Sequence, residues 1–246
     1  MLITATFRFH FTLNDFLALA DRNAWVKYSF RDEPAVKDAI EALGVPHPEV
    51  DIIVVNCAIV DFNYKLQPND QVEVYPASPY TMWPEKAKLI PKSTLPYRFV
   101  LDVHLGKLAR LLRLLGFDTI FDAGLTDKEI AGISVSENRI LLTRSVGLLK
   151  LKSITRDYWL RSQHPEMQVQ EVVSYYKLAP EFKLFSRCMV CNGNIKAVPK
   201  EQIWELLPPK TRLYFHEFYQ CQSCQRVYWK GSHYERMQEF ISKLLQ

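Results

Sequence analysis

Several features are missing from this sequence, and each absence excludes a class of protein. No apolar run reaches about eighteen residues, so the sequence predicts no transmembrane helix and no membrane partner. The N-terminus, MLITATFRFHF, has no basic segment before a long apolar stretch, so we expect no export signal and a cytoplasmic location. No glycine-rich loop follows the apolar run at residues 99–101, which argues against a Rossmann nucleotide site or a P-loop.

The composition is that of a globular protein with a mild basic excess. Hydrophobic residues make up 48% of the 246 residues, enough to bury a core in two domains or in one large domain. The formal net charge is +4, which permits nucleic-acid binding without arguing strongly for it. Four of the five cysteines form two CxxC pairs, and Cys57 stands alone. In a reducing compartment, such pairs indicate metal ligands rather than disulfides.

Residues 1–76 are predicted to form a small α+β domain. Two stretches, 3–11 and 25–30, alternate apolar with polar or small residues, as strands with one solvated face do. A helix is expected after Glu33-Pro34, ending at Gly44. Shorter strands are expected at 51–55, 58–62 and 72–75, separated by turns at Asn56-Cys57 and Pro68-Asn69-Asp70.

One segment of this domain, VVNCAIVDFNYKLQPNDQVEVYP, resembles a β-grasp, ubiquitin-like domain of the sulfur-carrier type. Sulfur carriers end in Gly-Gly, whereas this domain continues into Pro76-Ala77-Ser78-Pro79. The resemblance therefore implies a docking or scaffolding role, with a protein partner, rather than thiocarboxylate chemistry. No histidine lies near Cys57 in sequence, so we interpret Cys57 as a small residue at a turn and not as a nucleophile.

Residues 77–96 are predicted to be a linker. Prolines at positions 76, 79, 84, 91 and 96 resist regular structure, because each removes a hydrogen-bond donor and restricts the residue before it. We expect a semi-stiff linker that Trp83 attaches to a domain surface.

Residues 97–180 alternate predicted strands and helices, which is typical of a parallel sheet covered on both sides. The stripe Leu105, Leu108, Leu112 and Leu115 predicts an amphipathic helix that stops at Gly116. Strands are expected at 98–102, 118–121, 139–143 and 158–160, and helices at 104–115, 126–137 and 165–178, with a short helix after residue 143.

Carboxylates follow the first two of these strands. Asp102 stands where open parallel sheets bind ligands, although an aspartate there also suits a cap for the next helix. Asp122, Asp127 and Glu129 follow the second strand, and clustered carboxylates suit Mg²⁺ or Mn²⁺. Such a metal activates water and stabilises the leaving oxygen of a phosphodiester. For Asp127 and Glu129, ordinary helix-start chemistry beside Thr126 is the alternative.

Residues 181–246 contain both CxxC pairs and a predicted helix at 233–245. Two tight CxxC turns deliver four thiolates to a tetrahedral zinc ion, and the 29-residue insert between them loops out at small entropic cost. Four cysteines leave no open position, so we expect structural zinc; thiol pairs without metal, or a redox pair, are the alternatives. The expected ligands are Cys188, Cys191, Cys221 and Cys224.

Five segments together resemble the Mut-seven C-terminal ribonuclease family: RFVLDVHLGKLARLLRLLGFDT, TDKEIA, NRILLTR, RCMVCNGNI and CQSCQRVYWKGSHYERM. The resemblance implies an α/β fold: a β-grasp domain, a PIN-like parallel-sheet domain at 97–180 and a zinc ribbon at 181–246. It also implies metal-dependent RNA cleavage at an acidic site. Carried over by position, Asp102 is the first ligand for Mg²⁺ or Mn²⁺, and Asp127, with Glu129, is the second acidic contribution.

The chain departs from the family at one position. The third-strand motif usually reads TRD, but here it reads Thr143-Arg144-Ser145, and a serine hydroxyl is a poor metal ligand. A non-catalytic RNA-binding or adaptor protein is therefore the alternative to a ribonuclease. Candidate RNA contacts are Lys107, Arg110, Arg113, Arg144 and His233, although solvated helix faces or helix capping would explain the same residues.

Overall fold

The computed structural model describes residues 3–77, 83–84, 87–89, 96–149, 151, 154 and 156–245. The linker prediction for 77–96 therefore falls largely outside the described residues. Contacts divide the chain into two compact units, one of Met1–Thr94 with Ser145–Trp159 and one of Leu95–Arg144 with Leu160–Gln246. No helix in the described part of the chain is long and apolar enough to cross a membrane.

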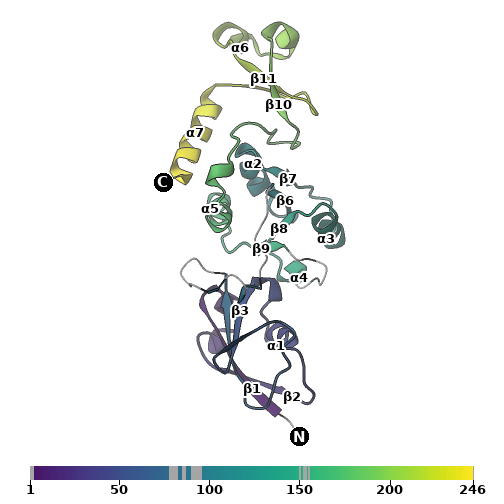
Figure 1. The fold of residues 1–246 in the computed structure, drawn as a ribbon. Helices are drawn as coiled ribbons and strands as arrows, with labels where there is room; N and C mark the ends of the chain where they lie inside the picture. Colours follow the sequence, from purple (N-terminus) through teal and green to yellow (C-terminus); the bar gives the residue numbers. More distant parts are fainter. Residues whose placement is uncertain are drawn as a thin grey trace. The chain divides into compact units, whose positions relative to one another are not determined.

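The first unit contains a five-stranded sheet with the order β2-β1-β5-β3-β4, drawn in purple and blue in Figure 1. β1 and β5 pair in parallel, whereas the other neighbours pair antiparallel, which is the arrangement expected of a β-grasp domain. The elements are β1 Ile3–Phe9, β2 Val26–Phe30, α1 Val36–Ala42, β3 Val50–Val55, β4 Ala58–Val60 and β5 Gln71–Pro76.

The local sequence explains the positions of two turns in this unit. Asn56 and Cys57 both have positive φ, 47° and 70°, as a two-residue hairpin between β3 and β4 requires. The buried carboxylate of Asp70 accepts hydrogen bonds from Asn56, Tyr64 and the Gln67 backbone, so it connects two turns. The predicted turns at 56–57 and 68–70 are confirmed, and Cys57 is exposed at the hairpin.

The segment after β8 groups with the first unit, although the sequence predicted it within 97–180. It contains α4, Val146–Leu149, and β9, Asp157–Trp159. The centre of the Trp159 ring lies 4.5 Å from that of Phe16, and the Trp159 backbone N–H donates to Glu49 Oε1 at 3.2 Å. These contacts with distant parts of the sequence explain the grouping.

The second unit contains the predicted parallel strands, with β6 between β7 and β8. The leucine stripe of α2 is confirmed, since Leu105, Leu108, Leu112 and Leu115 are all at most 2% exposed. The elements are β6 Arg98–Leu101, α2 Gly106–Leu114, β7 Asp118–Ile120, α3 Asp127–Ser136, β8 Ile140–Thr143 and α5 Pro165–Tyr176.

The C-terminal part of this unit is a ribbon. Three antiparallel strands have the order β10-β11-β12, and a helical insert precedes β11 (Figure 1). The elements are β10 Ile195–Val198, a 3-10 helix at Lys200–Leu206, α6 Pro209–Tyr214, β11 Phe218–Cys221, β12 Val227–Trp229 and α7 Ser232–Leu244.

Candidate functional site

Asp102 follows β6 and is 3% exposed. Its Oδ2 accepts hydrogen bonds from the Thr143 hydroxyl at 2.7 Å and from the Arg144 backbone N–H at 2.8 Å. Its Oδ1 accepts one from the His104 backbone N–H at 2.9 Å, and its own N–H donates to Leu142 O. The carboxylate therefore connects the carboxyl ends of β6 and β8 through neutral donors.

The structure also addresses the capping alternative for Asp102. The residue at the N-cap position of α2 is Leu105, which makes no side-chain cap. Asp102 instead accepts from His104, two residues on, in an Asx-type turn. Its carboxylate is therefore placed by the two strand ends and not by the N-terminus of α2.

The other acidic candidates lie at the start of α3. Thr126 and Glu129 form a reciprocal capping box, in which the Glu129 N–H donates to Thr126 Oγ1 and Glu129 Oε2 accepts from the Thr126 N–H and hydroxyl. Hydrogen bonds from the Thr126 backbone and side chain lower the pKa of the exposed Glu129. Asp127 is exposed in the first turn of α3. Helix-start chemistry thus accounts for the position of Glu129.

Within the described part of the chain, only the cysteines bring three or more metal-binding side chains within 4.8 Å of one another. Asp102, Asp127 and Glu129 do not form such a group. In the described part of the chain, the three carboxylates therefore do not meet around one ion as we expected. A hard cation at Asp102 would need water or substrate oxygens to complete its coordination.

Ser145, the position at which the family resemblance implies an acid, lies directly before α4. Its Oγ accepts a hydrogen bond from the Leu148 N–H at 3.4 Å, three residues on, as an N-cap side chain does. Aspartate is an equally favourable N-cap residue. An acid at this position is therefore compatible with the local structure.

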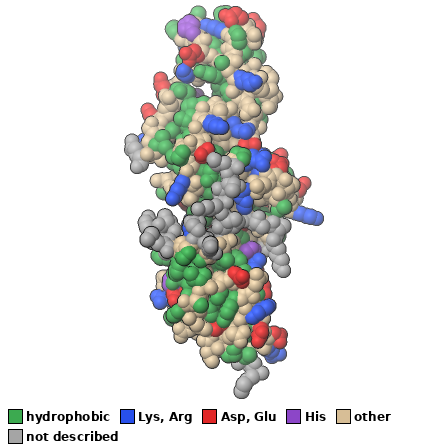
Figure 2. All heavy atoms as spheres, viewed as in Figure 1, with side chains coloured by type: hydrophobic (Ala, Val, Ile, Leu, Met, Phe, Trp, Pro, Cys, Tyr) green, Lys and Arg blue, Asp and Glu red, His purple; other side chains and the backbone are tan. Residues whose placement is uncertain are grey.

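The basic candidates differ in exposure. Lys107 and Arg110 are exposed on α2, and Arg144 is exposed after β8. Arg113, predicted as a candidate RNA contact or as a base on a solvated helix face, is only 4% exposed, so it does not lie on a solvated face. His233 is exposed in the first turn of α7, within the predicted helix at 233–245. On the face seen in Figure 2, Lys and Arg side chains are scattered and form no continuous stripe.

The four cysteines of the two CxxC pairs fit a metal ion. Cys188 Sγ lies 3.6 Å from Cys224 Sγ, and Cys191 Sγ lies 3.4 Å from Cys221 Sγ. Four sulfurs about 2.3 Å from a central zinc ion would be roughly 3.8 Å apart, so the spacing suits a tetrahedral site. The backbone N–H groups of Cys191 and Cys224 donate to Cys188 Sγ and Cys221 Sγ, each at 3.5 Å. This donor set could hold a metal such as zinc.

The surroundings of Cys188 favour a thiolate, the form that binds metal. Burial by itself raises the pKa of this thiol, but hydrogen bonds from the Tyr228 hydroxyl and from backbone N–H groups lower it, whereas burial and the neighbouring thiols raise the pKa of Cys191. Tyr228 Oη lies 3.0 Å from Cys188 Sγ. Gly193 leaves room for the cluster, since a Cβ there would lie 2.9 Å from Cys221 Sγ.

Arg113 joins the first CxxC turn to the parallel sheet. Its Nη1 donates to Met189 O at 3.2 Å and to Val190 O at 2.8 Å, the two carbonyls between Cys188 and Cys191. Its Nε donates to Thr119 O at 3.0 Å. A single buried guanidinium thus contacts both the metal-binding turn and β7.

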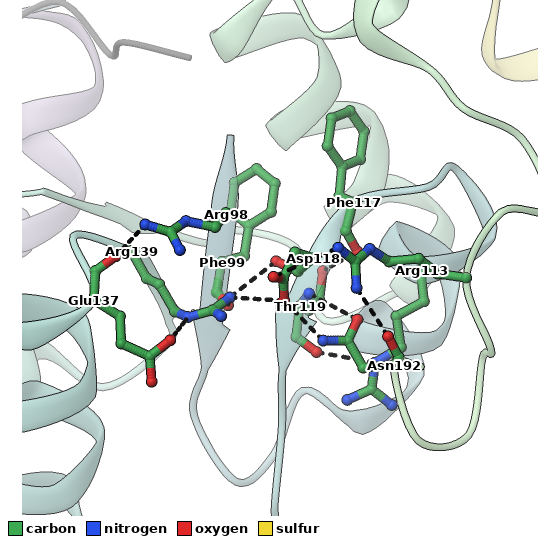
Figure 3. Close-up of polar contacts among 10 residues, drawn as sticks. Arg98, Phe99, Arg113, Phe117, Asp118, Thr119, Glu137, Arg139 and Asn192 are labelled. Atoms are coloured by element: carbon green, nitrogen blue, oxygen red, sulfur yellow. Dashed lines mark hydrogen bonds and ion pairs between the residues drawn. The ribbon is translucent and has the colours of Figure 1, made fainter. Parts of the chain in front are cut away.

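Asp118, at the start of β7, is the centre of a polar network shown in Figure 3. Its Oδ1 accepts from Arg139 Nη1 at 2.9 Å and from Asn192 Nδ2 at 2.8 Å, and its Oδ2 lies 3.5 Å from Arg187 Nη2. Burial raises the pKa of Asp118, but the hydrogen bonds from Arg139 and Asn192 outweigh it and hold the pKa below its ordinary range. The network connects β7, the start of β8 and the ribbon.

The fold and the cysteine cluster define a class of protein: a β-grasp domain joined to a parallel-sheet domain with a four-cysteine ribbon. The family model for the Mut7-C RNAse domain matches residues 97–241, and that for the Mut7-C ubiquitin domain matches residues 2–81. No curated protein and no solved structure matches the chain. The chain belongs to the Mut7-C RNAse domain family, in the arrangement with an N-terminal ubiquitin-like domain.

Sequence reasoning missed the polar network at β7. It assigns Asp118 only to a strand and Arg113 to an exposed flank, and it gives Asn192 no role beyond following a CxxC pair. Helical periodicity gave no signal for it, because position 113 lies off the stripe of Leu105, Leu108, Leu112 and Leu115, and its burial is visible only in the packed structure. A buried arginine requires partners, which here come from about 76 residues away.

Proposed function

We propose that this chain is a divalent-metal-dependent ribonuclease that hydrolyses phosphodiester bonds of RNA in the cytoplasm, with Asp102 as its essential acid. The observation that supports this most is the position of Asp102 within the segment that matches the Mut7-C RNAse domain. It stands at the carboxyl end of a buried parallel strand, the edge at which open α/β sheets bind ligands.

The chemistry of the metal agrees with a site that has few direct protein ligands. Mg²⁺ usually keeps several waters and binds one or two carboxylates together with substrate phosphates. The three donors to Asp102 are neutral, so its negative charge is available to a cation. When bound, such an ion supplies an activated water and stabilises the leaving oxygen. Asp127 is the second acid of the proposal and would act through water or substrate oxygens, since it forms no ligand group with Asp102 and Glu129. Glu129 has a supporting role, because its capping box holds the start of α3 that carries Asp127.

Exposed bases supply the proposed RNA contacts. Lys107 and Arg110 lie on the helix that follows Asp102, and Arg144 is the residue whose backbone N–H donates to Asp102. These side chains would hold backbone phosphates without reading sequence. His233, in the first turn of α7, is a further candidate for phosphate contact or proton transfer. The four-cysteine cluster has a structural role, since four thiolates leave zinc no open position.

The decisive experiment uses Asp102→Asn in the full-length chain. Purified wild type is incubated with labelled RNA and Mn²⁺ or Mg²⁺, and cleavage is compared with that of the variant. We expect a loss of at least about 100-fold, because an amide keeps the shape but not the charge needed by a cation. Thr143→Val is the matched control: it removes one hydrogen bond to the carboxylate but keeps the carboxylate itself. A fully active Asp102→Asn variant would refute the proposal.

A second function is supported by Ser145 and by the finding that Asp102 belongs to no cluster of three or more metal-binding side chains among the described residues. In this alternative the chain binds RNA without cutting it. Wild type would then bind RNA with steep salt dependence and show no cleavage with either metal. Ser145→Asp tests whether the missing acid is the cause, since aspartate keeps the N-cap of α4. Cleavage by Ser145→Asp alone would identify position 145 as the defect.

The ubiquitin-like domain is proposed to recruit a protein partner. Its lack of a terminal diglycine argues against sulfur transfer and leaves docking as the role. The test compares the proteins recovered with the full chain and with variants substituted on exposed faces of residues 2–81. A partner recovered with the full chain but not with these variants would support the docking role.

A further inference from the structure

The first CxxC turn lies against the outer edge of the parallel sheet. Among the described strands β7 pairs only with β6, and Thr119 lies opposite Phe99 in that register. The N–H and C=O of Thr119 are both bonded to groups outside the sheet: the N–H donates to Asn192 Oδ1 at 3.0 Å and the C=O accepts from Arg113 Nε at 3.0 Å. Side chains therefore supply the hydrogen-bond partners for the N–H and C=O groups of Thr119 at the outer edge of β7.

Both of these residues also contact the metal-binding turn, Arg113 through its side chain and Asn192 through its backbone. Arg113 donates to Met189 O and Val190 O, the carbonyls enclosed by the first CxxC pair. Asn192 follows Cys191 directly and donates its backbone N–H to Cys188 O at 2.9 Å. Of the two residues that close the edge of the sheet, Asn192 is thus part of the chain that forms the CxxC turn, and Arg113, on α2, is hydrogen-bonded to that turn.

Charge connects the two sites as well. A zinc ion with four thiolates carries a net charge of about −2, and cationic side chains near such a cluster stabilise it. Arg113 is buried at this position, where water cannot replace its hydrogen bonds. Replacing it would leave carbonyls of the turn and of Thr119 without a partner, which is costly in a buried region.

We propose that metal binding at the four-cysteine site closes the edge of the parallel sheet, with Arg113 as the positioning residue that couples the two. Metal release frees the turn, so the Thr119 N–H loses Asn192 and Arg113 loses the Met189 and Val190 carbonyls, which loosens the outer edge of β7. A loosened edge exchanges its backbone N–H groups faster. This coupling is independent of RNA cleavage.

The first test is hydrogen exchange on the full-length wild-type chain, zinc-loaded or treated with a chelator under reducing conditions. We expect exchange in the peptide containing β7 to accelerate at least about tenfold on metal removal, while the peptide containing β3 in the ubiquitin-like domain stays unchanged. Unchanged exchange at β7 after complete metal removal, shown by metal analysis, would overturn the proposal.

The second test measures zinc affinity by competition with a chromogenic chelator. Arg113→Met should lower the affinity by roughly 10- to 100-fold, the usual effect of losing an outer-sphere partner. Arg110→Met is the matched control, since it removes a base from an exposed position of the same helix and should leave the affinity within about twofold. If Arg113→Met does not fold, Arg113→Lys replaces it, because lysine keeps the charge but not the forked donors. Equal affinities for the variants at 113 and 110 would overturn the role of Arg113.

Discussion

The ion pair between Asp118 and Arg139 provides a quantitative prediction for the second unit. The two side chains are 22% and 6% exposed, and their atoms lie 2.9 Å apart. Hydrogen bonds to charged groups contribute about 1.5–3 kcal/mol, so Asp118→Asn, which keeps an acceptor but loses the charge, should lower the free energy of unfolding by about 2 kcal/mol. Asp118→Ala should cost more, about 3 kcal/mol, because Arg139 loses its buried partner.

A double-mutant cycle isolates the pair. Urea unfolding at fixed zinc concentration is measured for wild type, Asp118→Asn, Arg139→Met and the double variant. We expect a coupling energy of about 1–2 kcal/mol, because the two groups are in direct contact. Glu217→Gln is the control: its pair with Lys230 is exposed on both sides and should contribute nothing measurable. Additive effects of Asp118→Asn and Arg139→Met would refute the reasoning.

The same pair predicts a pH dependence with a definite sign. The folded-state pKa of Asp118 lies below its ordinary value of 3.8, so the ionised carboxylate contributes stability above that value. The contribution is lost as the pH falls through the folded-state pKa. The difference in stability between wild type and Asp118→Asn should therefore be constant from pH 7 to about pH 5 and shrink below about pH 4. A difference that grows in acid would contradict the assignment.

Two further substitutions, each with a control, test backbone features. Gly116→Ala places a Cβ 2.3 Å from Lys183 O at a φ of +98°, so it should lower the free energy of unfolding by about 2 kcal/mol or more. Gly132→Ala in α3, where a Cβ meets nothing within 4 Å, should instead raise it by roughly 0.5–1 kcal/mol; equal effects of the two variants in urea unfolding would contradict the clash at position 116. Thr126→Ala removes the capping box of α3 and should lower the melting temperature by roughly 2–4 °C. The control Ser136→Ala changes an exposed residue near the other end of α3 and should leave the melting temperature unchanged. Equal melting temperatures for the two variants would contradict a stabilising cap at Thr126.

Features with a short-range cause were predictable from the sequence. The CxxC pairs require four thiolates near one point, and the structure brings all four sulfurs within 4.8 Å. The leucine stripe of α2 follows from helical periodicity, and the Asn56-Cys57 turn from the tolerance of asparagine for positive φ. In each case the residues that decide the outcome are neighbours in the sequence or share a strict spacing.

Only the tertiary structure determines the long-range partners of polar groups. Position 113 reads as one more base on a helix flank, and only packing shows that it is buried against the CxxC turn, 77 residues away at Val190. The sequence assigns Asp118 only to a strand, and its hydrogen-bond donor Asn192 comes from 74 residues away. Sequence periodicity reports which side of an element is buried, but not which distant donor or acceptor meets it there, because that depends on how elements far apart in the chain come together.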